Sequence, residues 1–67
     1  MVEDADILRA AKLLIHQHGP NAPMLAVRWA DEMLAAGDVE GRAVWLLILA
    51  VVEELIRREP KEGERVN

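Results

Sequence analysis

Chemistry in this chain can rest on few kinds of side chain, because serine, threonine, cysteine and tyrosine do not occur among its 67 residues. Nucleophilic catalysis would depend on aspartate, glutamate, histidine or lysine. The only histidines, His16 and His18, are two positions apart. On a helix they point about 200° away from each other, so one chain cannot hold a metal ion with both. A shared metal site would require His18 to meet carboxylates of another chain at a symmetry axis.

Two pairs of neighbouring carboxylates, Asp31–Glu32 and Glu53–Glu54, are the other candidates for acid–base chemistry. Catalytic carboxylates need burial or a charged neighbour to adjust their protonation. Both pairs fall on helix arcs that we expect to face solvent. We therefore predict that the protein is not an enzyme and has no catalytic residue, no cofactor and no metal site.

Charge and composition narrow the classes of partner. The net charge is −4 and the pI is about 5.0, and the basic residues are spread along the chain, so we expect no binding to nucleic acid or to a membrane surface. The acidic start, MVEDADIL, has neither the basic nor the apolar segment of a signal peptide. The absence of cysteine fits a reducing compartment. We predict a cytoplasmic protein.

The elements that position these residues are helices, and the predicted fold class is all-α. Three helices are expected over about 5–18, 22–36 and 39–58, in a single helical domain over 1–59 with a flexible polar tail over 60–67. Loops this short predict that successive helices are antiparallel neighbours in a compact three-helix unit.

Glycine and aspartate mark the expected helix ends. Gly19 and Gly37 are predicted to end the first two helices, and Pro20 prevents the first from resuming. The expected N-caps are Asp4 or Asp6 for the first helix, Asn21 for the second and Asp38 for the third.

The third helix has an inward face and a polar side at helical spacing. The predicted inward residues are Val44, Trp45, Ile48, Val51, Val52, Leu55 and Ile56. On the polar side, Glu53–Arg57 and Glu54–Arg58 have the spacing of ion pairs. Gly41, near the start, is expected to let a neighbouring backbone approach closely, with Trp45 filling the space one turn further on.

Leu46 and Leu47 break this pattern, because they lie among the charged positions of the third helix. Burial of each leucine would contribute about 1.5–3 kcal/mol, and a symmetric dimer in which two third helices pack together would bury both. The predicted oligomer interface contains Trp45, Leu46, Leu47, Leu49 and Ala50. Two alternatives stay open: a third helix threaded centrally between the other two, and a surface that docks a different protein.

The predicted function is a non-catalytic helical structural or protein-interaction module that self-associates as a homo-oligomer, with a dimer favoured. The alternative is a binding protein for a small apolar ligand at an interhelical or subunit interface. Its pocket would use the only two aromatic residues and their neighbours: Trp29, Met33, Trp45 and His18.

The stretch from Ala30 to Trp45 follows a recognisable pattern: a helix end, Gly37-Asp38, then Gly41, Trp45 and Ile48. It resembles a group of short, uncharacterised three-helix proteins that are common in alphaproteobacteria. The resemblance covers most of residues 5–56 and implies the three-helix fold and a bacterial source, but it brings no activity. In that group the positions after the tryptophan are often polar, whereas this chain has Leu46 and Leu47.

Overall fold

The computed structural model describes residues 4–58, and these residues are helical with no strand. The elements are α1 (Asp4–His18), a short 3₁₀ helix η1 (Gly19–Asn21), α2 (Ala22–Ala35) and α3 (Val39–Arg58). The three predicted helices are confirmed to within one residue at each end. The tail predicted over 60–67 lies outside the described residues.

The turn between α2 and α3 is a Schellman motif built on Gly37. Gly37 has φ +78°, and its N–H donates to the carbonyl of Leu34 at 3.0 Å, while the Asp38 N–H donates to the carbonyl of Met33 at 2.8 Å. Gly19 likewise has φ +56° at the end of α1. Both glycines therefore end their helices as the sequence predicts, because a left-handed residue costs glycine no steric strain.

The predicted N-caps are confirmed at only one of three helices. Asp38 caps α3, since its Oδ1 accepts the Gly41 N–H at 2.8 Å. Asn21 precedes α2 but makes no side-chain cap hydrogen bond, because it belongs to the 3₁₀ turn and has helical backbone angles. Asp4 and Asp6 lie within the first turn of α1, and Asp6 forms an ion pair with Arg9 at 3.3 Å.

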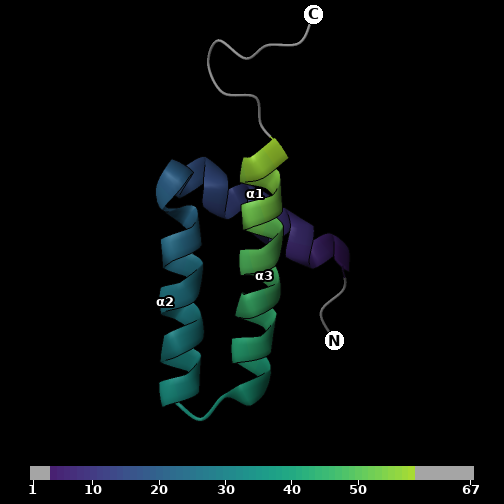
Figure 1. Ribbon diagram of the computed structural model, residues 1–67. Coiled ribbons are helices and arrows are strands. Elements are labelled where there is room, and N and C mark those ends of the chain that lie inside the picture. Colours follow the sequence, from purple (N-terminus) through teal and green to yellow (C-terminus); the bar gives the residue numbers. More distant parts are fainter. Residues whose placement is uncertain (1–3, 59–67) are drawn as a thin grey trace, which may run out of the picture.

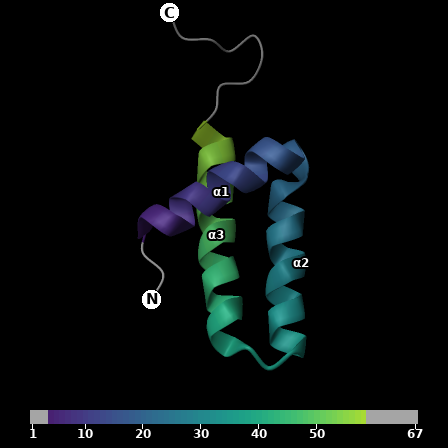
Figure 2. The ribbon, with the colours of Figure 1, turned by 180° about the vertical axis from the view of Figure 1, so that it is seen from behind.

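The arrangement of the helices differs in part from a bundle of antiparallel neighbours. α2 and α3 form an antiparallel hairpin, but α1 crosses behind the end of the hairpin that lies away from the α2–α3 turn (Figures 1 and 2). α3 packs against both other helices, whereas α1 and α2 contact each other little. The prediction that α1 and α2 are antiparallel neighbours is wrong, because η1, with Pro20 and left-handed Gly19, turns the chain sharply.

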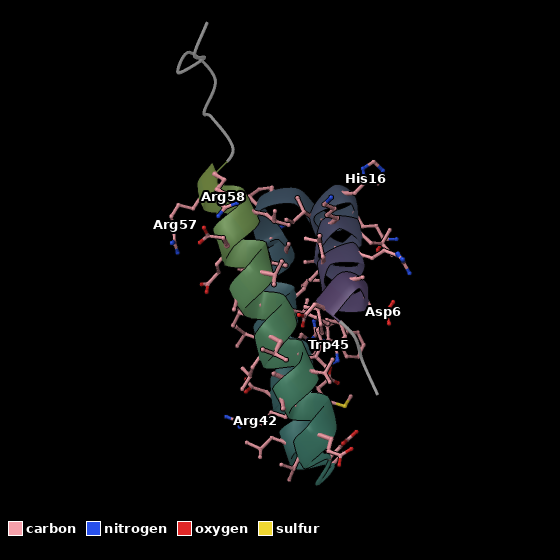
Figure 3. All side chains as sticks on the ribbon, turned by 90° about the vertical axis from the view of Figure 1, so that its right-hand side faces the viewer. Asp6, His16, Arg42, Trp45, Arg57 and Arg58 are labelled. Atoms are coloured by element: carbon pink, nitrogen blue, oxygen red, sulfur yellow. The ribbon has the colours of Figure 1, made fainter. Side chains whose placement is uncertain are left out.

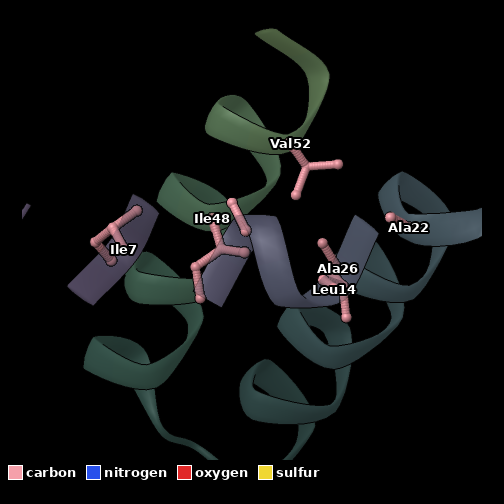
Figure 4. Close-up of a cluster of buried hydrophobic side chains, with 7 residues drawn as sticks. Ile7, Leu14, Ala22, Ala26, Ile48 and Val52 are labelled. Carbon is pink, nitrogen blue, oxygen red and sulfur yellow. The ribbon is translucent and has the colours of Figure 1, made fainter. Parts of the chain in front are cut away.

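The core lies where α1 crosses the hairpin (Figure 4). Half of its buried residues are alanines, and Val52 is the largest side chain that is fully buried among the described residues. The buried residues are Ile7, Ala11, Leu14, Ala22, Ala26, Ala30, Ile48 and Val52. The predicted inward residues of α3 are all buried or partly buried. α1 thus covers the contact between α2 and α3 at only one end of the hairpin, and the core enclosed there is small.

Candidate functional site

The outward side of α3 exposes the leucines that the sequence singles out. Leu46 is 38% exposed and Leu47 is 56% exposed, and Ala50 is also exposed. Trp45 and Leu49 are instead partly buried and pack against the core. The predicted interface residues therefore divide into an outward group of three and an inward group of two.

Leu46 and Leu47 point in different directions. Figure 3 shows Trp45 on the side of α3 that faces α1 and Arg42 on the opposite side. Leu46 is one turn after Arg42, so it also faces away from α1, and Leu47 is about 100° further around the helix. A partner helix centred on Leu46 would meet Leu47 only at its edge.

Central placement of α3 does not account for the exposed leucines. α3 does contact both α1 and α2, which is the arrangement that could have buried a helix on several sides within one chain. Leu46 and Leu47 nevertheless remain exposed. The apolar surface of α3 therefore exceeds what the described part of the chain covers.

α2 and the start of α3 expose further apolar side chains that the sequence reasoning does not assign to a surface. Val27 and Leu34 are exposed on α2, and their spacing of seven residues places them on the same side of that helix. Val39 is exposed at the first position of α3. The sequence indicates this exposure, because the apolar arc of α2 is about 200° wide. That is broader than the single apolar stripe that a surface helix buries against its core.

The two tryptophans stack on each other across the hairpin. The ring centroids of Trp29 and Trp45 are 5.9 Å apart with an interplanar angle of 19°. Trp29 is 41% exposed, so one member of the stack is open to solvent. An offset stack of this kind contributes about 0.5–1.5 kcal/mol beyond the area it buries. It ties α2 to α3 within the hairpin.

Met33 and His18 complete the predicted ligand pocket, and Met33 lies one helical turn from the stack, four residues after Trp29. Met33 packs at Gly41, where a Cβ added to the glycine would lie 3.0 Å from Met33 Sδ and 2.5 Å from Asp38 Oδ2. The three atoms nearest to that position are thus side-chain atoms of its own cap and of α2, whereas the sequence predicts the close approach of a neighbouring backbone. His18 is exposed at the C-terminal end of α1.

The residues considered for catalysis or metal binding are not assembled. Within residues 4–58, no group of three or more histidines and carboxylates could hold a metal ion, and every buried residue is apolar. His16 projects from the end of α1 that is away from Asp6 (Figure 3). A surface hollow does occur on α1, lined by Ala5, Leu8, Arg9 and Lys12, but it contains none of the predicted site residues.

Charged side chains at the end of α3 pair differently from the prediction. Arg58 Nε contacts Glu54 Oε1 at 3.0 Å, as the spacing predicts. Arg57 does not pair with Glu53 and instead contacts Glu54 Oε2 at 3.1 Å. Glu54 therefore holds both arginines, and in the described structure Glu53 is left without an ion pair.

No helix over residues 4–58 is long and apolar enough to cross a membrane. The chain matches no protein-family model, no curated protein and no solved structure. The resemblance to short alphaproteobacterial three-helix proteins therefore stays a prediction that rests on Gly37, Asp38, Gly41 and Trp45.

Proposed function

We propose that this protein is a non-catalytic helical module that self-associates through α3 and acts as a structural or protein-interaction element. The observation that carries the proposal is the exposure of Leu46 and Leu47 on a helix that already packs against both others. Soluble monomers seldom expose large contiguous apolar patches. A second copy is the simplest cover, since closed two-fold dimers are the commonest oligomers.

The small core supports the same proposal. Half of the buried residues are alanines, and chains of this size bury only about 60% of their unfolded surface, a smaller fraction than larger domains do, and are marginally stable alone. Disulfides cannot help, because the sequence has no cysteine. Burial of apolar surface between copies would add the stabilisation that the core lacks. The absence of cysteine also fits our placement of the module in the bacterial cytoplasm.

The test is the mass in solution of the wild-type chain and of the double variant Leu46→Glu, Leu47→Lys. Sedimentation equilibrium should give a dimer or larger species for the wild type and a folded chain of 7.5 kDa for the variant. Leu13→Glu is the matched control, since Leu13 is as exposed as Leu47 but lies on α1. If the double variant is folded and keeps the wild-type mass, self-association through α3 is wrong.

The stacked tryptophans favour a second candidate function, the binding of a small apolar ligand. Trp29 presents a half-exposed ring against Trp45, and flat apolar compounds can stack on such a ring. Tryptophan fluorescence titrated with a panel of apolar aromatic compounds should then change and saturate. Met33→Ala should alter the affinity, whereas Met24→Ala, exposed near the start of α2, should not. A flat response across the panel would remove this candidate.

A further inference from the structure

The outward side of α3 carries an ordered row of exposed residues, which we call the outer stripe. It consists of Val39, Ala43, Leu46 and Ala50, and all four are exposed. Their spacings are four, three and four residues, which is the repeat of a coiled-coil seam. The alanines on either side of Leu46 would let another helix approach α3 closely.

The outer stripe is not covered by α1. Figure 3 shows Arg42 and Arg57 on the side of α3 away from α1. Leu46 lies four residues after Arg42 and eleven before Arg57, and both spacings bring residues to nearly the same direction on a helix. The middle of the stripe therefore faces outward, on the free side of the α2–α3 hairpin.

Two opposite charges that form no ion pair within residues 4–58 lie near the two ends of the stripe. Among the ion pairs of residues 4–58, Arg57 and Arg58 are both taken up by Glu54. Neither Arg42 nor Glu53 belongs to an ion pair within that part of the chain. They stand four residues before and seven residues after Leu46, on the same flank of the stripe. The chain thus presents a positive end and a negative end separated by apolar residues.

We propose that α3 packs antiparallel against α3 of a second copy, with the two-fold axis near Ile48 and with Arg42 of each copy paired to Glu53 of the other. An antiparallel pair centred there brings Leu46 against Ala50 of the second copy and places Arg42 within one residue of the level of its Glu53, about 1.5 Å along the helix. In a parallel pair, Arg42 of one copy and Glu53 of the other would be eleven residues, about 16 Å, apart along the helices, so they could not pair. This arrangement rests on the proposed self-association and specifies its partner, orientation and register.

Charge reversal tests the arrangement. Sedimentation equilibrium at low salt is measured on the wild type, on Arg42→Glu, on Glu53→Arg and on the double variant that carries both changes. Each single change brings two like charges together at two positions in the dimer, because the two-fold axis repeats the contact between positions 42 and 53. We expect each single variant to dissociate about tenfold more readily than the wild type, which is about 1.4 kcal/mol. The double variant should return to within about threefold of the wild type, since both pairs re-form with the charges exchanged.

Arg28→Glu is the matched control, because Arg28 is exposed on α2 and lies outside the outer stripe. It should leave the dissociation constant unchanged. If the wild type is a dimer that the single reversals do not weaken, or if the double variant is not restored, the antiparallel register is wrong while self-association stands. A wild-type chain that is monomeric at every concentration would overturn both the register and the proposed function.

Discussion

The substitution Val52→Ala tests whether α1 packs across the α2–α3 hairpin and buries the side chains between the three helices. Val52 is fully buried and lies in the cluster with Ile7, Leu14 and Ile48 (Figure 4). The change removes two methyl groups, for a transfer loss of about 1.6 kcal/mol at about 0.8 kcal/mol for each buried carbon. A cavity contribution raises the expected loss to about 2–3 kcal/mol. A domain of this size has a total stability of about 3–10 kcal/mol.

The matched control is Val27→Ala. Val27 is 42% exposed in the middle of α2, so both variants gain the same helix propensity, about 0.5 kcal/mol, from replacing valine by alanine. The difference between them therefore reports burial. Val27→Ala should change stability by no more than about 0.5 kcal/mol.

Urea denaturation followed by circular dichroism measures both variants. A slope of about 1 kcal/mol per molar urea is expected for a chain of this size, so the Val52→Ala midpoint should fall by about 2 M relative to Val27→Ala. All samples need the same chain concentration, because the stability of an associating protein depends on it. Equal midpoints for the two variants would refute the placement of α1 across the hairpin.

Four further outcomes follow from the turns and from association. Gly37→Ala should destabilise the fold by about 1–2 kcal/mol in thermal melting, because φ is +78°, and Gly37→Asn should recover part of the loss. Gly41→Ala should also destabilise, in spite of the better helix former, because the new Cβ would lie 2.5 Å from Asp38 Oδ2 and would displace the carboxylate whose Oδ1 caps α3. Asp38→Ala should cost about 1 kcal/mol through the lost cap, whereas Asp31→Ala, in an exposed helix interior, should cost nothing measurable by the same melting. The wild-type melting temperature should fall on tenfold dilution, and a constant value would contradict a dimer that dissociates in that range.

Helix boundaries can be predicted because their signals are local. Gly37 needs only its own φ and two backbone hydrogen bonds to end α2, and Asp38 needs only the N–H three residues ahead to cap α3. The inward face of α3 is also predicted correctly, since burial follows the 3.6-residue period. None of these features requires knowledge of where another helix lies.

The features that could not be predicted depend on geometry between elements. The sequence places a break at Gly19 and Pro20, but the direction of α1 depends on how the 3₁₀ turn rotates the chain. Gly41 does mark a close approach, but which atoms approach depends on where Met33 of α2 lies. Arg57 has two carboxylates within reach on the surface of one helix, and spacing alone cannot distinguish the pairing with Glu54 from a pairing with Glu53.

Leu46 is an exception to the amphipathic pattern of α3, and this exception supports the proposed dimer. A helix that meets both α1 and α2 needs a wide inward face, and Trp45, Ile48 and Val52 belong to it. Leu46 lies away from that face, so intramolecular packing gives no reason for its apolar character. The polar residues that bracket Leu46, Arg42 and Glu53, are opposite in charge and unpaired within the described chain. A surface meant only for solvent needs neither the central leucine nor the opposed charges, whereas a self-complementary helix pair uses both.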